Sequence, residues 1–368
     1  MKNKTVITLL AAALAVLSPC AFATTLSTTL SGYEGFGLET EVDLPDATPE
    51  SSITRVAVLV HGSGAQGMHE DLTSVSAGVK NLFFDDVSAA LVKKGFAVIR
   101  YNKRNFQINK MAAKTPSILK SELLAKFTSN PLLYFVEDAK AAAQFAAQRF
   151  PAAKVYMIGH SEGTNVALQA AAQSTSTVSG VALIGFYCGS LDNVLLEQTV
   201  YRPLYIFDQL DANKDGALDA NELAADNPAA KSISRQMSAI DLNHDGKLEK
   251  SEFMAANYTH VIMDFNDSMR AYRKQEASYP TQADIIKNAD FKIAFFQGEL
   301  DNQTPAYYAK SIELINRAVW QKENLSFHFF DGLGHALDKR SSDVDLVFKP
   351  ADQTALSDMA SELDDFWK

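Results

Sequence analysis

The chain has 368 residues, 47% of them hydrophobic and 21% charged, which is the composition of a folded globular protein with a substantial core. The formal net charge of −10 at pH 7 argues against nucleic acid or an anionic membrane surface as a partner, because both carry phosphate charge. Two cysteines are too few to indicate a fold held together by disulfides.

The first 23 residues have the pattern of a signal peptide. Lys2 and Lys4 give a basic start, residues 6–17 are apolar, and residues 21–23 read Ala-Phe-Ala, a small-residue cleavage site. The apolar run is too short to span a bilayer comfortably. We therefore expect an exported protein, periplasmic or extracellular, with no stable membrane anchor.

Apolar strands and helices alternate along most of the remaining chain. Residues 24–45 alternate polar and apolar side chains around glycines, which predicts an antiparallel hairpin. Buried strands are expected at residues 53–60, 96–101, 154–158, 178–186, 291–298 and 325–330. Helices are expected at residues 85–94, 117–127, 135–150 and 305–320, directly after residue 161, and from about residue 352. This alternation predicts an α/β fold with a doubly wound, mostly parallel sheet.

The strand and helix pattern stops for about a hundred residues in the second half of the chain. We predict a first core segment at residues 24–190, a helical cap insertion at residues 191–290, and a second core segment at residues 291–368. The insertion therefore separates two strands of one sheet.

The strand at residues 154–158 runs into Gly159-His160-Ser161-Glu162-Gly163 and then into an Ala-rich helix. This is the Gly-x-Ser-x-Gly pattern of a nucleophile elbow, in which a sharp turn projects the serine hydroxyl into a cleft. Glycines on both sides let the strand and the helix approach closely. Ser161 is the predicted nucleophile, and the alternative is a glycine-rich turn with an idle serine.

A serine hydroxyl needs a general base, and the base needs an orienting acid. In folds with this elbow the chain order is Ser, acid, His. Asp301 follows the strand at residues 291–298, and His335 follows the last strand. Both lie at carboxyl ends of strands, where open α/β sheets place their sites. Asp301 and His335 are the predicted acid and base, with Glu299 as the second candidate for the acid.

Two backbone N–H groups are the predicted oxyanion hole. One belongs to Glu162, the residue after the nucleophile, and the other to Ser63, in the loop that follows the strand at residues 53–60. His61, at the end of that strand, is expected to shape the loop rather than to take part in chemistry.

Two segments of the insertion match the twelve-residue EF-hand calcium loop, at residues 211–222 and 241–252. Each loop offers side-chain oxygens and, at its seventh position, a backbone carbonyl oxygen. Oxygen ligands of this kind suit a hard cation such as calcium. The predicted ligands are Asp211, Asn213, Asp215, Ala217, Asp219 and Glu222 in the first loop, and Asp241, Asn243, Asp245, Lys247, Glu249 and Glu252 in the second. Leu218 and Leu248 occupy the apolar position that pairs two such loops. We predict two calcium ions, structural or regulatory, against the alternative of a solvated acidic loop.

A family resemblance rests on residues 61–64 (His-Gly-Ser-Gly), residues 100–104 (Arg-Tyr-Asn-Lys-Arg), the elbow at residues 159–163, Asp301 and His335. Together they resemble secreted bacterial α/β-hydrolases, those grouped with serine aminopeptidases, acyl thioesterases and prolyl-oligopeptidase-like hydrolases. The likeness covers the two core segments and implies the α/β-hydrolase fold. The insertion resembles a compact EF-hand pair.

The chain departs from these relatives at two positions. They commonly read Arg-Tyr-Asp-Lys-Arg-Gly where this chain has Asn102 and Asn105, which leaves the conformation of the loop after Arg104 open.

The function that follows is a secreted serine hydrolase that forms an acyl-enzyme at Ser161. Its substrate would be a small-molecule ester, a thioester or a peptide. The alternative is a calcium-binding or interaction protein on a catalytically silent hydrolase scaffold.

Overall fold

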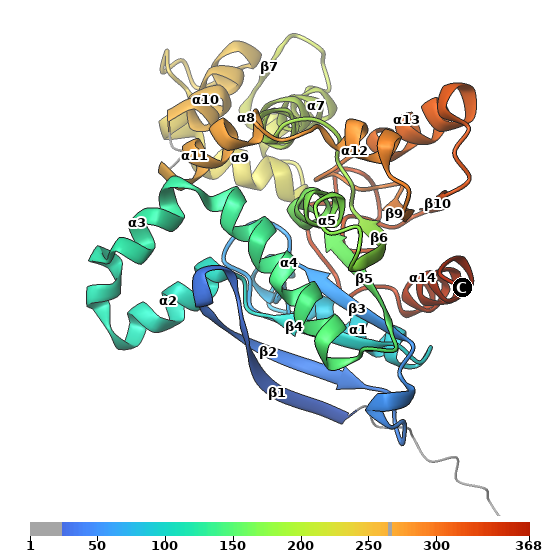
Figure 1. Cartoon of the computed structure of the whole chain (residues 1–368). Coiled ribbons are helices and arrows are strands. Elements are labelled where there is room, and N and C mark those ends of the chain that lie inside the picture. The colour runs from blue at the N-terminus through green and yellow to red at the C-terminus, as the bar shows by residue number, and fades with distance from the viewer. Residues whose placement is uncertain (1–23, 264–266) are drawn as a thin grey trace, which may run out of the picture.

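The computed structural model describes residues 24–263 and 267–368, so the predicted signal peptide lies outside the described residues. An eight-stranded sheet forms the centre, in the order β1-β2-β4-β3-β5-β6-β9-β10 (Figure 1). Its strands are β1 (Thr24–Ser31), β2 (Gly37–Leu44), β3 (Arg55–Val60), β4 (Ala97–Tyr101), β5 (Lys154–His160), β6 (Val178–Ile184), β9 (Lys292–Gly298) and β10 (Leu325–Phe330).

The sheet is parallel except at one edge. β1 and β2 form the predicted antiparallel hairpin, in register from Thr24 opposite Leu44 to Ser31 opposite Gly37. β2 also pairs antiparallel with β4, and every other pair in the sheet is parallel. The expected α/β architecture with a mostly parallel sheet is confirmed.

Helices lie on both faces of the sheet. The α-helices are α1 (Phe83–Val92), α2 (Arg104–Lys114), α3 (Glu122–Ser129), α4 (Pro131–Arg149), α5 (Glu162–Ala172), α6 (Leu191–Leu196), α7 (Arg202–Leu210), α8 (Ala220–Leu223), α9 (Pro228–Ile240), α10 (Lys250–Met263), α11 (Asp267–Glu276), α12 (Gln282–Asn288), α13 (Tyr307–Ile315) and α14 (Gln353–Phe366). Short 3-10 turns are η1 (Tyr33–Gly35), η2 (Glu50–Ser52), η3 (Thr73–Val75) and η4 (Pro116–Lys120), and π-helical turns are η5 (Glu197–Tyr201) and η6 (Asn316–Trp320). Across the two described ranges, no helix is both long enough and apolar enough to span a bilayer.

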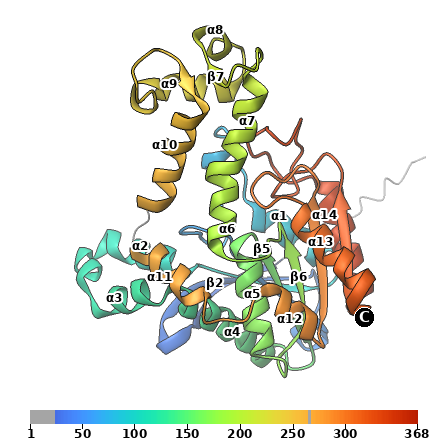
Figure 2. The same cartoon turned by 90° about the horizontal axis from the view of Figure 1, so that it is seen from above.

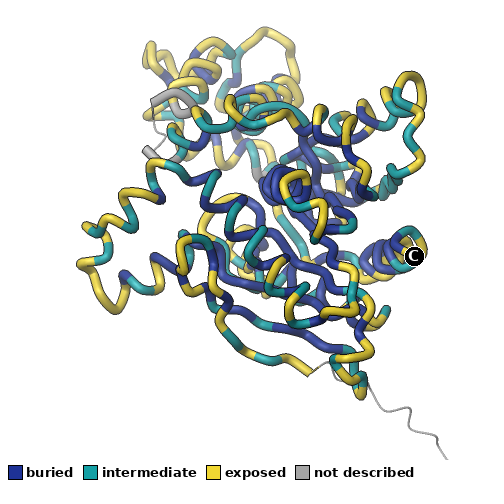
Figure 3. Tube along the Cα trace, viewed as in Figure 1, coloured by how far each residue is buried: buried dark blue, intermediate teal, exposed yellow. Residues whose placement is uncertain are grey.

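Two hydrophobic clusters sandwich the sheet, and the strands feed them alternately. Val56, Val58 and Val60 of β3 join the cluster with α4 and α5. Ala57 and Leu59 join the cluster with α1 and α14. Successive side chains of a strand point to opposite faces, so a continuous apolar run is what a strand covered on both sides requires. The central strands β4, β3, β5, β6 and β9 are accordingly buried, whereas the edge strands β1 and β10 are partly exposed (Figure 3).

The connection at residues 102–130 is more helical than the sequence indicates. It contains α2, η4 and α3, whereas the expectation was a polar segment with one helix. α2 is mostly polar and buries few side chains, among them Ile108 and Ala112, so its apolar face is too sparse to predict. α4 begins at Pro131, four positions before the expected start at 135, with proline in its first turn.

The part of the insertion from α6 to α10 forms an arm that projects from the core, whereas α11 and α12 pack against core helices (Figure 2). α6, η5 and α7 run outward, and α10 returns alongside them. At the tip, β7 (Ala217–Leu218) pairs antiparallel with β8 (Leu248–Glu249), with Leu218 opposite Leu248 as predicted. The tip has a small core of its own, separate from the two clusters of the sheet. Both acidic loops therefore lie at the far end of the arm, away from Ser161.

Candidate active site

Ser161 sits in a strained turn between β5 and α5. Its φ of 54° and ψ of −122° are sparsely populated by residues with a side chain. The Ser161 N–H donates to the Ile184 carbonyl at 2.9 Å, which holds the turn against β6. A Cβ on Gly159 would clash with the backbone of Gly163, and a Cβ on Gly163 would clash with the Val60 carbonyl. Both glycines of the motif are thus required by close packing.

His335 and Asp301 form a buried pair. The His335 Nδ1 lies 2.9 Å from Asp301 Oδ2, and the exposed fraction of Asp301 is 2%. Burial alone would raise the pKa of Asp301, but the charge and hydrogen bond of His335 hold it below its ordinary value. A carboxylate so placed fixes the imidazole with Nδ1 protonated and leaves Nε2 free to accept a proton.

Ser161 and His335 lie at the same end of the sheet, beyond the carboxyl ends of its parallel strands. The His335 ring fills the space that a Cβ on Gly185 would take, and Gly185 directly follows the residue that accepts the Ser161 N–H. The His160 ring lies 4.8 Å from the His335 ring, centre to centre. The structure thus places the predicted base and acid in direct contact and the predicted nucleophile at the same end of the sheet. Glu299, the second candidate acid, is exposed and pairs with Lys310 at 2.7 Å.

Two residues that hydrogen-bond to Asp301 were not predicted from the sequence. Thr304 donates its N–H to Oδ1 at 2.8 Å and its hydroxyl to Oδ2 at 2.9 Å. Gln297, fully buried in β9, donates its side-chain amide to Oδ2 at 2.8 Å and accepts the Phe186 N–H. A glutamine within an apolar strand was the available signal, because such a group must find partners when buried.

The predicted oxyanion donors lie beside the predicted nucleophile, Ser161. A Cβ on Gly62 would come within 3.3 Å of the Ser161 Cβ, so the loop that carries Ser63 passes directly by the elbow. Within the described ranges, the backbone N–H groups of Ser63 and Glu162 have no hydrogen-bond partner. His61 is buried against Phe84, and burial lowers its pKa to about 4, which suits a neutral packing residue.

Charged side chains surround the elbow in pairs. The Lys103 ammonium contacts the Glu162 carboxylate at 2.7 Å, and His160 Nδ1 contacts Glu70 Oε1 at 2.8 Å. All four side chains are at most 10% exposed. A charge this deeply buried is tolerated only with a partner.

The departure at Asn102 has a structural reason. Its Oδ1 accepts the Met68 N–H at 3.0 Å, and its Nδ2 donates to Gln107 at 2.9 Å and to Glu39 at 3.2 Å. An aspartate could not donate to those two oxygens. The chain continues directly into α2, with Arg104 paired to Asp138, so the loop left open by the sequence is a helix start.

Glu276 connects the insertion to the elbow helix and was also missed. Its carboxylate accepts the Leu191 N–H at 2.6 Å and an Asn165 side-chain N–H at 3.4 Å. Burial, with the nearby charges of Asp192 and Glu162, raises the pKa of Glu276 to about 7. No pattern in the sequence distinguishes it from other acids of α11.

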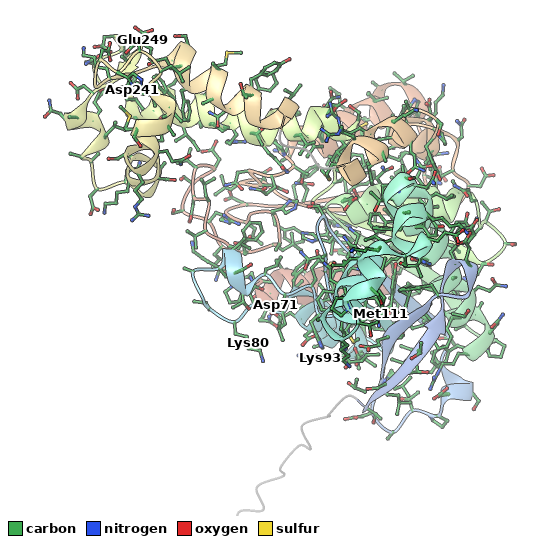
Figure 4. All side chains as sticks on the ribbon, turned by 90° about the vertical axis from the view of Figure 1, so that its left-hand side faces the viewer. Asp71, Lys80, Lys93, Met111, Asp241 and Glu249 are labelled. Atoms are coloured by element: carbon green, nitrogen blue, oxygen red, sulfur yellow. The ribbon has the colours of Figure 1, made fainter. Side chains whose placement is uncertain are left out.

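In the acidic loops at the arm tip, the last carboxylate of each loop accepts hydrogen bonds from backbone N–H groups of the same loop. Glu222, at the twelfth position, accepts the Ala212 N–H at 2.9 Å and the Asp219 N–H at 3.0 Å. Glu252 accepts the Leu242 N–H and the Glu249 N–H, each at 2.9 Å. Figure 4 shows Asp241 and Glu249 at this end of the molecule.

The calcium sites remain a prediction. In residues 24–263 and 267–368, no group of three or more His, Cys, Asp or Glu side chains converges as a metal site would require. One atom would suit a cation: within the described chain, Asp241 Oδ1 is buried and has no hydrogen-bond partner. Gly216 and Gly246 adopt φ values of 85° and 82°, which the sixth position of the loop demands.

Comparison with known proteins assigns the chain to a family. The model of the α/β-hydrolase fold family matches residues 58–330. The chain belongs to the α/β-hydrolase family. Esterase EstD of Thermotoga maritima is 31% identical to this hydrolase over 144 residues, which are 39% of the present chain and 30% of EstD. The match therefore spans less than a third of the length of that esterase.

Two solved structures resemble the hydrolase over most of its length. A puromycin-hydrolyzing peptidase of Mycobacterium tuberculosis has a TM-score of 0.50 at 14% identity, covering 94% of this chain and 39% of the peptidase. A Staphylococcus aureus protein of unknown function has a TM-score of 0.50 at 12% identity, covering 93% and 100%. At these identities the likeness shows the fold alone.

Proposed function

We propose that this α/β-hydrolase is a serine esterase that cleaves a small-molecule carboxylic ester. The observation that carries the proposal is the buried His335–Asp301 pair at 2.9 Å, at the sheet edge where strained Ser161 is held. The name of the relative EstD supports an ester over the other acyl substrates. Thioesters and amides follow the same chemistry and are outcomes of the test below.

The proposed mechanism uses the same residues in acylation and in deacylation. His335 Nε2 takes the Ser161 hydroxyl proton as Oγ attacks the ester carbonyl carbon. The resulting oxyanion receives hydrogen bonds from the N–H groups of Ser63 and Glu162, each worth about 3–4 kcal/mol in the transition state. Collapse of the intermediate expels the alkoxide, which takes the proton from His335, and leaves an acyl-enzyme at Ser161. Water then attacks the acyl carbon by the same route and releases the acid. Asp301 keeps the imidazole oriented throughout.

A substrate panel tests the proposal. Aryl esters of short and long acyl chains, acyl thioesters and aminoacyl amides are each offered to the wild type and to Ser161→Ala. We expect the highest kcat/KM on an ester and none above background for the variant. Equal rates for the two proteins would remove Ser161 from the reaction. A wild type inert to every acyl substrate would support the alternative, a binding protein on a silent scaffold.

We also propose that the arm tip binds two calcium ions. The ligands would be the oxygen-bearing positions of residues 211–222 and 241–252, with the carbonyls of Ala217 and Lys247. The unpartnered Asp241 Oδ1 supports this, because a buried carboxylate oxygen without a donor suits a cation. Calorimetric titration with calcium should give two sites in the wild type. Glu222→Gln with Glu252→Gln should lose them, and an unchanged isotherm would contradict the proposal.

Export is the third part of the proposal. It rests on the basic start, apolar run and Ala-Phe-Ala sequence of residues 1–23. Periplasmic or extracellular protein should begin at Thr24 by N-terminal sequencing. Protein found only in the cytosol with residues 1–23 retained would contradict it.

A further inference from the structure

Two buried ion pairs flank the nucleophile in the sequence and converge on one glycine. His160 precedes Ser161 and pairs with Glu70, while Glu162 follows Ser161 and pairs with Lys103. Both pairs reach Gly62. Glu70 Oε1 accepts the Gly62 N–H at 3.0 Å, and Lys103 Nζ donates to the Gly62 carbonyl at 2.7 Å.

The Gly62 carbonyl belongs to the same peptide unit as the Ser63 N–H. A peptide unit is planar and trans, so its C=O and its N–H point in opposite directions. An ammonium that holds the Gly62 oxygen therefore also fixes the direction of the Ser63 N–H. That N–H has no partner of its own within the described chain, and the loop lies beside Ser161.

We propose that Lys103 is a positioning residue: through the Gly62 carbonyl it aims the Ser63 N–H at the oxyanion, and the Glu162 side chain holds Lys103 in place. The inference rests on the proposed hydrolase function, for which Ser63 is an oxyanion donor. The Glu70–His160 pair anchors the preceding peptide unit through the Gly62 N–H. The elbow and the oxyanion loop are thereby tied together on both sides of Ser161.

The ammonium is fully engaged, which a positioning role requires. Besides Glu162 and the Gly62 carbonyl, Lys103 Nζ lies 4.3 Å from the centre of the Phe135 ring. The Glu70–His160 pair is also held by close contact, at 2.8 Å between Oε1 and Nδ1. Burial would raise the pKa of Glu70 and lower that of His160, but their mutual attraction and hydrogen bond reverse both shifts.

A pure stability role is an unconvincing reason for such pairs. Replacing a buried ion pair by apolar residues of similar volume is often neutral or stabilising, whereas removing one partner strands a charge. The Lys103–Glu162 pair does something that apolar residues could not, since it supplies a charged donor to a backbone carbonyl.

The test is the double variant Lys103→Met with Glu162→Leu, which removes the donor without leaving a buried charge. We expect kcat on the best ester to fall about 10- to 100-fold, approaching the loss of an oxyanion donor, with KM little changed. The affinity for a boronic acid, which forms a tetrahedral adduct with the serine, should fall in proportion to kcat/KM. The matched control is Arg104→Met with Asp138→Leu, which removes the neighbouring buried pair but no contact to Gly62. It should leave kcat near that of the wild type, whatever the change in its melting temperature.

A second readout is independent of turnover. Selective ¹⁵N labelling of serine gives the Ser63 amide signal, which should shift in the Lys103→Met, Glu162→Leu protein and stay in place in the control. If the double variant does not fold, Glu162→Gln takes its place, with a smaller loss in kcat and the same proportionality to boronate affinity. A wild-type kcat together with an unmoved Ser63 amide would overturn the positioning role. A wild type without hydrolysis or boronate binding, but with the Ser63 shift, would instead overturn the proposed function alone.

Discussion

The elbow and the arm tip are both rich in carboxylates, but they balance that charge in different ways. At the elbow, Glu162 faces Lys103, Glu70 faces His160 and Asp301 faces His335. At the tip, none of the carboxylates predicted to bind calcium has an ion-pair partner within the described chain. They accept backbone N–H bonds instead.

The difference concerns what each region needs in order to hold its shape. The elbow is held by paired charges and by two hydrophobic clusters of the sheet, so it is preorganised without any added ion. The tip has a small cluster of its own and unpaired negative charge, so its stability should depend on a cation. We therefore expect a core that folds without an added ion and an arm whose stability depends on the proposed calcium ions.

The largest expected difference between the elbow and the arm tip comes from replacing the predicted nucleophile. Ser161→Ala should lower kcat by about six orders of magnitude, because the elbow loses the group that forms the acyl-enzyme. Its melting temperature and its calcium isotherm should match those of the wild type, because the tip does not depend on the elbow. A variant that retained a tenth of the wild-type rate would rule out Ser161 as the nucleophile.

Replacing the predicted acid, Asp301, should give the next largest loss of kcat. Asp301→Asn should lower kcat about 10⁴-fold, because an amide favours the wrong imidazole tautomer at His335. Glu299→Gln is the control, since Glu299 is exposed and paired with Lys310. Steady-state kinetics on the best ester compares the two. A large loss in the Glu299 variant with little in the Asp301 variant would exchange their roles.

Removal of calcium should act on the tip and spare the elbow. At a hundredfold excess over Kd, a bound ion stabilises the folded state by about 2.7 kcal/mol, and chelation removes that term. We expect a lower melting temperature and faster proteolysis at residues 191–290, while the core fragments survive. Glu222→Gln with Glu252→Gln should behave like chelated protein even in calcium. Superimposable calorimetric traces, from a sample confirmed metal-free, would show that the loops do not need the ion.

The smallest predicted effect lies where the arm joins the elbow. The pKa of Glu276 is raised from 4.5 to about 7, so the folded protein binds this proton more tightly than the unfolded chain. Stability from this group is therefore complete below pH 4.5 and is lost as the pH rises through about 7. The melting temperature in excess calcium should fall between pH 5 and pH 7.5 by a few degrees less in Glu276→Gln than in the wild type. Glu323→Gln, at an exposed position, should keep the wild-type slope, and equal slopes in all three proteins would count against Glu276.

Local patterns predicted the sheet and the positions of the three catalytic candidates. The β-branched run of β3 and the glycines around Ser161 are local patterns typical of a buried strand and of a strand-to-helix turn, so both elements could be predicted from the sequence. The supporting contacts could not. Lys103 and Glu276 contact partners that lie far away in the sequence, and Gln297 links the nearby Asp301 to the distant Phe186. Only the folded sheet brings these distant partners together. The arm was likewise hidden, because a local loop motif does not say where in space the loop lies.

The central claim is that Ser161 is an activated nucleophile in a core that does not need the arm's metal. The most direct measurement is peptide mapping after a fluorophosphonate has reacted with the wild type, in calcium and in excess chelator, beside His335→Ala. We predict a single adduct, on Ser161, formed at closely similar rates in both conditions and lost in the His335 variant. An adduct on another residue, no adduct on the wild type, or labelling that disappears on chelation would contradict the account.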